Sequence, residues 1–183
     1  MNRELLKEGI STYATEYSGE MAFVPRFLAL LQIENCYERS LLSGHLTGSA
    51  WVIHPDFTQV LLLHHKKLDR WLQPGGHADG EEDILAVTLK ELEEETGLSD
   101  VTLIGNSFFD LDIHTIPQRK GVPTHEHYDV RFAFVANQPE QLVKNEESNE
   151  LRWVPIDQMS ALIGEDLSMQ RLLEKTLSLD GFR

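Results

Sequence analysis

The sequence predicts an α+β domain preceded by an N-terminal helical segment. The chain has 183 residues, of which 41% are hydrophobic, and this suits one globular domain with an appended segment. Short β-branched or apolar runs of strand length begin near residue 46, and one strongly patterned helix interrupts them. We therefore assign residues 1–40 to the helical segment and residues 41–183 to the domain.

The N-terminal segment carries apolar residues at helical intervals over residues 2–33. A break at Ser18-Gly19 divides the pattern and predicts two helices. Nothing in these helices indicates chemistry, so we expect a cap on the domain or an arm that forms a homodimer. The apolar positions are Leu5, Leu6, Ile10 and Tyr13, and then Phe23, Phe27, Leu30 and Leu31.

The central elements follow in order along the domain. Pro55-Asp56 separates two adjacent strands, and Pro74-Gly75-Gly76 forms a turn that ends an irregular stretch. The helix expected after this turn carries acidic residues in its first turn, which favours its dipole, and it ends at a glycine cap, Gly97. A polar loop and a last helix complete the domain. The predicted strands are 46–54, 59–64, 101–104, 108–113, 128–135 and 151–154, the irregular stretch is 68–76, the helices are 81–96 and 168–179, and the loop is 117–126.

Charge and cysteine content exclude several classes of protein. Sixteen basic and 30 acidic residues give a formal charge of -14, which opposes sequence-independent binding to nucleic acid or to an anionic membrane. Cys36 is the only cysteine, so an intramolecular disulfide and a cysteine zinc cluster are both excluded. The N-terminus lacks a signal-peptide pattern, and no apolar run reaches the roughly 18 residues of a membrane span. These features predict a cytoplasmic protein.

The central helix presents a cluster of carboxylates. Glu91, Glu94 and Glu95 fall within an arc of about 100°, whereas Glu93 points away from them. We expect a buried stripe on the opposite side of the helix, formed by Leu85, Leu89 and Leu92. Three carboxylates on one rigid face suit Mg²⁺ or Mn²⁺ and leave coordination positions open for phosphate oxygens. The alternative is a solvated acidic face without a ligand.

The residues around these carboxylates carry a longer pattern. Gly76 is followed by five residues, Glu82, seven residues, and then KELEEETGL from Lys90 to Leu98. This resembles the Nudix box, G-x5-E-x7-R-E-U-x-E-E-x-G-U, in which U is apolar. Every fixed position agrees except that Lys90 replaces the usual arginine, and the preceding WLQPGG resembles the common lead-in. The resemblance covers residues 46 to about 162 and omits the first 40.

The resemblance implies a fold, a metal site and a reaction. The fold would be a Nudix-type α/β/α sandwich with a mixed β-sheet. Glu91, Glu94 and Glu95 would bind the metal together with the main-chain carbonyl of Gly76. Glu82 would support this cluster. The reaction would be hydrolysis of the diphosphate linkage of a nucleoside diphosphate joined to another moiety, X, or of a related small-molecule diphosphate.

The resemblance also assigns Lys90 the task of orienting the neighbouring glutamate. An ammonium does this less rigidly than a planar guanidinium. The catalytic base would be Glu91 or a carboxylate of the acidic loop 144–150, which contains Glu146, Glu147 and Glu150, and we name Glu147 among the catalytic candidates.

Histidines and basic residues near the predicted strand ends are candidate substrate contacts. His125 and His127 share one face of a strand, His114 ends the preceding strand, and His77 follows Gly76 directly. They could contact phosphate or bind a metal, or they could be ordinary strand-end residues. Arg119 and Lys120 are further candidates for contacting an anion.

Two other functions remain open. A Nudix-like module could bind a ligand or regulate without hydrolysis, although such modules usually lose metal-binding glutamates. A diphosphate isomerase of this fold would use a catalytic cysteine, whereas Cys36 lies before the predicted domain. The substrate also stays open among nucleoside diphosphate sugars, dinucleoside polyphosphates, oxidised nucleotides and non-nucleotide diphosphates.

Overall fold

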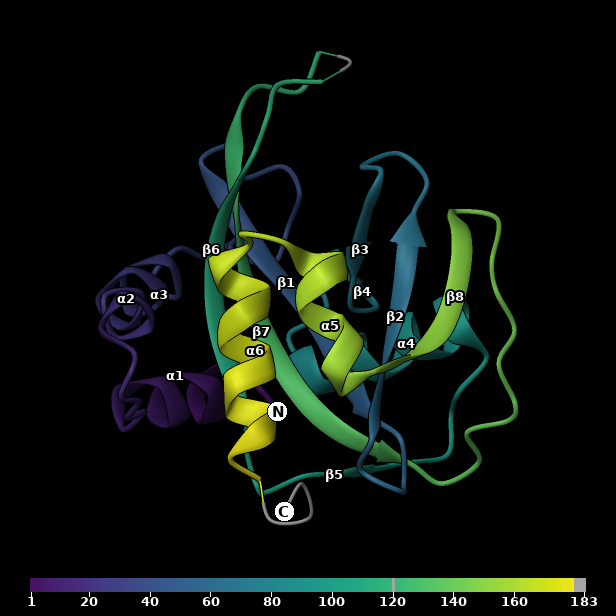
Figure 1. Cartoon of the computed structure of the whole chain (residues 1–183). Coiled ribbons are helices and arrows are strands. Elements are labelled where there is room, and N and C mark those ends of the chain that lie inside the picture. Colours follow the sequence, from purple (N-terminus) through teal and green to yellow (C-terminus); the bar gives the residue numbers. More distant parts are fainter. Residues whose placement is uncertain (120, 180–183) are drawn as a thin grey trace. The chain divides into compact units, whose positions relative to one another are not determined.

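The computed structural model describes residues 1–119 and 121–179 (Figure 1). Within these residues an eight-stranded sheet has the strand order β3-β2-β1-β7-β5, with β4 paired to β1, β6 to β7 and β8 to β2. The chain divides into two compact units, and β1, β4, β7 and α4 each continue from one unit into the other. The first unit comprises Met1–Ser49, Gly76–Thr88 and Ser107–Phe132, and the second comprises Ala50–Gly75, Leu89–Asn106 and the described residues from Ala133 onward.

The first unit begins with three helices: α1 (Arg3–Ser11), α2 (Ser18–Met21) and α3 (Val24–Leu30). The prediction of two helices with a break at Ser18-Gly19 is wrong, because α1 already ends at Ser11 and α2 begins at Ser18. Helix α1 packs against α3, and α2 packs against β6. An N-terminal helix is confirmed, and its apolar side chains Leu6 and Ile10 are fully buried.

A long antiparallel hairpin completes the first unit (Figure 1). It consists of β6 (Asp110–Ile116) and the first half of β7 (His125–Ala136). Strand β6 continues past its predicted end at residue 113 as far as Ile116, and β7 begins at His125, inside the predicted loop 117–126, because cross-strand pairing continues as far as these two residues. The unit also contains the first half of β1 (Gly44–Ile53) and the end of β4 (Gly75–His77).

The second unit is built around β2 (Gln59–His65). This strand pairs with β3 (Arg70–Leu72), with β8 (Ser148–Pro155) and with the end of β1. Strand β5 (Val101–Leu103) pairs with the second half of β7. Helices α5 (Ile156–Ile163) and α6 (Leu167–Leu177) pack against each other, and α5 also packs against β3 and β8.

Three of the elements are absent from the prediction, and β8 is longer than predicted. Strands β3 and β4 are too short to show a pattern, and α5 follows β8 without a loop. Strand β8 begins at Ser148, so it takes in part of the predicted acidic loop. The α+β class with a mixed sheet and an N-terminal helix is confirmed.

Helix α4 (Ile84–Thr96) begins three residues later than predicted. Its acidic residues precede the first turn instead of occupying it, and Asp83 accepts a hydrogen bond from the backbone amide of Ala86 at 3.0 Å. The glycine cap is confirmed: Gly97 has φ +76°, and its amide donates to the carbonyl of Glu93 at 2.8 Å. At 13 residues, α4 is the longest described helix, and no helix in the described ranges is long and apolar enough to cross a membrane.

Candidate functional site

The carboxylates at the end of α4 differ in exposure. Glu94 is exposed and Glu91 is half-buried, whereas Glu95 is only 9% exposed. The backbone amide of Gly75 donates a hydrogen bond to Oε2 of Glu95 at 2.9 Å. The last carboxylate of the helix is therefore hydrogen-bonded to the first residue of β4.

The buried stripe of α4 is not the one that the sequence predicts. Leu92 is fully buried, but Leu85 is half-buried and Leu89 is 36% exposed. The buried positions are Ile84, Val87, Thr88, Leu92, Glu95 and Thr96. In the first unit Gly48 allows β1 to approach the helix so closely that an added Cβ would lie 2.5 Å from Oγ1 of Thr88. This contact turns Thr88 inward, and the same helix phase places Glu95 at the end of the buried face.

Burial raises the pKa of Glu95 to about 7. This value already includes a lowering by the hydrogen bond from Gly75 and a raising by the charges of Glu91, Glu147 and Glu94. A carboxylate that is buried among other carboxylates is stabilised by a nearby cation. The donor set on this helix therefore fits a hard divalent ion.

Two of the predicted catalytic residues lie in the same unit as these carboxylates. Nζ of Lys67 lies 3.2 Å from Oε1 of Glu147, and both side chains are more than half exposed. Nζ of Lys90 lies 3.6 Å from Oε1 of Glu94, one helical turn away, in another exposed pair. The structure therefore gives the Lys90 ammonium a partner at Glu94. The Nudix resemblance implies a different task for it, which is to orient Glu91.

The remaining predicted site residues belong to the first unit. Glu82 forms an ion pair with Arg3 at 2.8 Å, and Gly76 continues β4 directly after Gly75. Arg119 is exposed and forms an isolated bridge with Val122 near the tip of the β6–β7 hairpin. Lys120 lies outside the described residues.

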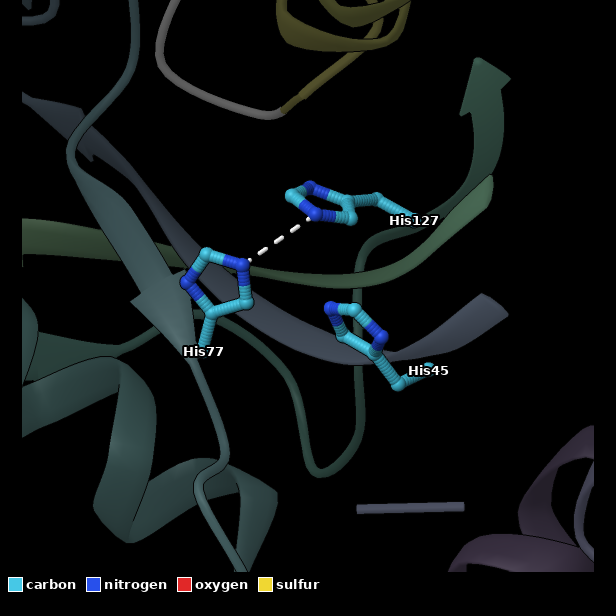
Figure 2. A group of neighbouring side chains, drawn as sticks. All are labelled: His45, His77 and His127. Atoms are coloured by element: carbon cyan, nitrogen blue, oxygen red, sulfur yellow. Dashed lines mark hydrogen bonds between the residues drawn. The ribbon is translucent and has the colours of Figure 1, made fainter. Parts of the chain in front are cut away.

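Five of the eight histidines in the sequence gather in the first unit: His45, His77, His114, His125 and His127. His45 on β1, His77 on β4 and His127 on β7 each place a ring nitrogen within 4.8 Å of the other two (Figure 2). We call these three residues the histidine cluster. The sequence interpretation includes His77 and His127 but misses His45. The alternation of His45, Thr47 and Ser49 in an otherwise apolar strand was the available signal.

Burial favours the neutral form of the imidazoles in the histidine cluster. Burial lowers the pKa of His127 to about 2 and that of His77 to about 4, and it also lowers the pKa of His45. Neighbouring histidines contribute to the lowering at all three residues, and at His77 the charge of Arg39 also contributes. Neutral imidazole is the form in which histidine binds a metal.

Next to the cluster, the same sheet face carries a buried ionic group. The guanidinium of Arg131 contacts Asp110 at 3.2 Å, Asp112 at 3.1 Å and Asp129 at 2.9 Å. Asp129 also accepts hydrogen bonds from the hydroxyls of Thr47 and Ser49, at 3.0 and 2.8 Å. Sequence reasoning missed this group, because a charged residue inside a predicted strand normally indicates the solvent face.

Cys36 does not resemble a catalytic thiol. Its side chain is fully buried, and burial raises its pKa, which disfavours the reactive thiolate.

Comparison with known proteins gives one consistent family. The family model of the NUDIX domain matches residues 45–175. A search of curated proteins finds no match to this chain.

Solved structures give the same result at the level of the fold. An Ap4A hydrolase from C. elegans has 17% sequence identity and a TM-score of 0.57, and the match covers 71% of this chain and 93% of that one. The E. coli dihydroneopterin triphosphate pyrophosphohydrolase has 17% identity and a TM-score of 0.59, with coverages of 73% and 96%. A MutT protein from Bacillus halodurans has 25% identity and a TM-score of 0.52, with coverages of 74% and 83%.

Proposed function

Because this chain belongs to the Nudix family, we propose that it is a metal-dependent hydrolase of diphosphate compounds. The proposed reaction cleaves the diphosphate linkage of a nucleoside diphosphate joined to another moiety, X, or of a related small molecule. The similar solved structures include hydrolases whose names specify an Ap4A and a dihydroneopterin triphosphate substrate. They support a reaction at a phosphoanhydride bond and leave the identity of X open.

The position of Glu95 is the observation that carries this proposal. A purely solvated acidic face would leave all its carboxylates in water. Glu95 is instead buried, hydrogen-bonded to the amide of Gly75 and close enough to Glu91 and Glu94 for their charges to raise its pKa. Such a carboxylate is costly to keep ionised without a cation.

We propose that Glu91, Glu94 and Glu95 hold Mg²⁺ or Mn²⁺, with the carbonyl of Gly76 as a further ligand and Glu82 in support. Hard oxygen donors are the ligands that these ions prefer. When bound, the ion would offset charge on the diphosphate oxygens and make a water molecule easier to deprotonate.

The chain's own residues would bind the substrate and move the proton. Glu147 is the proposed acceptor of a proton from the attacking water, because it lies on the loop before β8 and its charge acts on Glu95. Glu91 is the alternative acceptor. Lys90 would hold Glu94 in place through its ion pair. Arg119, His77, His125 and His127 remain proposed contacts of the substrate.

A metal-supplemented screen of diphosphate compounds tests this function. Metal-free protein would be incubated with nucleoside diphosphate sugars, dinucleoside polyphosphates and nucleoside triphosphates, with and without millimolar Mg²⁺ or Mn²⁺. Release of a monophosphate or of pyrophosphate only in the presence of metal is the expected result. A full rate without metal contradicts the metal requirement. Ligand binding without hydrolysis across the panel would favour a binding or regulatory module.

We also propose a cellular location, a class of substrate and an oligomeric state. We propose a cytoplasmic location, because the single cysteine requires no oxidising compartment, and a small-molecule substrate in place of nucleic acid, because the formal charge is -14. Association through the N-terminal helices into a homodimer also stays a proposal.

A further inference from the structure

The histidine cluster shares no residue with the carboxylate set of α4 and has its own chemistry. Its three members come from three strands, and their ring nitrogens lie within 4.8 Å of one another. Figure 2 shows a ring nitrogen of each residue pointing toward the middle of the group. Imidazole suits zinc and the late transition metals, whereas Mg²⁺ and Mn²⁺ prefer oxygen donors. The cluster therefore suits a different class of metal from the glutamates.

The hydrogen bonding of the His45 ring is typical of a histidine that binds a metal. Its Nδ1 lies 3.3 Å from the backbone carbonyl of Leu41, which accepts the ring proton and leaves the lone pair on Nε2. The residue is only 3% exposed, and Nε2 has no hydrogen-bond partner among the described residues. An unpaired buried nitrogen costs free energy, and a metal ion would remove that cost.

His77 and His127 already have the spacing of two ligands of one ion. Their Nε2 atoms lie 3.2 Å apart. Two nitrogens bound to a tetrahedral zinc ion at 2.0–2.1 Å are separated by roughly 3.3–3.4 Å. A small adjustment therefore converts the contact between the two rings into two metal bonds.

Neighbouring side chains restrict the movement of these rings. His125 stacks on His45 with ring centroids 5.2 Å apart, and its Nδ1 lies 2.9 Å from the carbonyl of Pro123. His114 packs edge to face on His127, and its Nδ1 lies 3.0 Å from a carboxylate oxygen of Asp112. A site with preset ring orientations loses little entropy when it binds an ion.

We propose that His45, His77 and His127 form a second metal site, which binds one Zn²⁺ or similar transition-metal ion through three Nε2 atoms. Three protein ligands leave one tetrahedral position for a water molecule or an anionic oxygen. The site goes beyond the proposed hydrolase function, in which His77 and His127 are proposed only as substrate contacts. Its three donors belong to neither the Nudix box glutamates nor their helix, so metal binding to it can be tested apart from hydrolysis.

Cobalt binding tests the site directly. Metal-free protein without an affinity tag would be titrated with Co²⁺ in excess Mg²⁺, while visible absorption is recorded. We expect one equivalent of Co²⁺ with the intense bands of four-coordinate geometry, and we expect Zn²⁺ to displace it. His77→Ala and His127→Ala should each weaken binding by at least about 100-fold, because even residues that support a metal ligand can contribute that much.

Matched variants separate this site from the carboxylate site. His54→Gln removes a histidine of the second unit that is paired with Asp56, and it should leave cobalt binding unchanged. Glu95→Gln should also leave it unchanged, even if hydrolysis is lost. Failure of the hydrolase proposal would thus not alter the titration, and failure of the histidine site would not alter the metal requirement of hydrolysis.

Two results would overturn the proposal. One is the absence of stoichiometric Co²⁺ or Zn²⁺ binding by the wild-type chain, and the other is equal binding by the wild type and His127→Ala. If an alanine variant fails to fold by circular dichroism, X-ray absorption of the zinc-loaded wild type decides the question. Scattering from three imidazoles supports the site, and an all-oxygen ligand shell excludes it.

Discussion

The glutamates of α4 and the histidine cluster collect their donor atoms by opposite routes. Glu91, Glu94 and Glu95 come from two turns of one helix, so their proximity follows from the helical repeat alone. His45 and His127 are 82 positions apart in the numbering and meet through the packing of strands. The helical set is hard and anionic, and the strand set is borderline and neutral. The comparison teaches that a helix can collect oxygen donors within a few residues, whereas nitrogen donors that suit a different class of ion can come from strands far apart in the sequence.

The largest expected effect is the loss of kcat when a carboxylate of the proposed metal site is replaced. Glu95→Gln should lower kcat on the best substrate of the screen by about 10²–10³-fold, because it removes a buried carboxylate from the proposed metal site. Glu93→Gln is the matched control, since Glu93 is exposed on another side of the helix, and it should change kcat little. Equal losses in both variants would show that the helix face is assigned incorrectly.

Thermal unfolding with each metal tests whether the two regions are independent. Zn²⁺ at about 100 times its Kd should raise the Tm of the wild type by roughly 5–10 °C, because binding to the folded state alone contributes about 2.7 kcal/mol. His127→Ala should lose this shift and keep the shift caused by Mg²⁺, and Glu95→Gln should show the reverse. A single variant that loses both shifts would join the two regions into one site.

The pH dependence of stability should expose the burial of Glu95. The folded state raises this pKa to about 7, so it favours the protonated form, and the associated stability is complete below about pH 4.5 and is lost as the pH rises through 7. In metal-free buffer, Glu95→Gln should therefore be more stable than the wild type at pH 8, by roughly 1–3 kcal/mol. Urea unfolding at pH 5 and pH 8 measures this, and an equal difference at both pH values would contradict it.

The histidine cluster should give stability the opposite pH dependence. The folded state lowers the pKa of His77 to about 4, so the associated stability is complete above about pH 6.5 and is lost as the pH falls toward 4. Metal-free His77→Gln should lose less stability than the wild type between pH 6.5 and pH 5. Urea midpoints across this range test the prediction, with His54→Gln as the control, and parallel curves for wild type and His77→Gln would refute it.

The smallest expected effect concerns Lys90. Its pair with Glu94 is exposed, and such a pair contributes about 0–1 kcal/mol. Lys90→Met keeps an unbranched side chain and should change the free energy of unfolding by less than about 1 kcal/mol. A clear fall in kcat in a variant whose free energy of unfolding is unchanged would show that the ammonium orients a glutamate. An unchanged kcat would remove Lys90 from the catalytic residues.

The two regions also show what a single sequence can predict. The spacing from Gly76 to Leu98 identifies the family and the helix, because every distance within that pattern is local. The phase of α4 could not be predicted from the same residues. It depends on the approach of β1 at Gly48, which buries Thr88 and leaves Leu89 at the surface.

The ends of the strands and the histidine cluster could not be predicted from the sequence, because both depend on tertiary structure. Strand β7 begins at His125 because its partner β6 continues to Ile116, and no local signal in the polar loop predicts that pairing. His45 is one histidine in an apolar strand, and its significance depends on strands that are distant along the chain. The short strands β3 and β4 and the helix α5 were missed for the same reason.

The ionic group around Arg131 also determines how the β6–β7 hairpin can fold. A shift by one residue would turn the polar row of β6 away from that of β7, and a shift by two would place Asp112 opposite Arg131 and leave the fully buried Asp110 without its pairing. Breaking such a buried pair costs about 3–5 kcal/mol. The buried ion pairs therefore destabilise shifted registers of the hairpin, which purely apolar strands would tolerate. A chain that reaches the correct alignment also places His127 where it meets His45 and His77, so tight zinc uptake would report faithful folding.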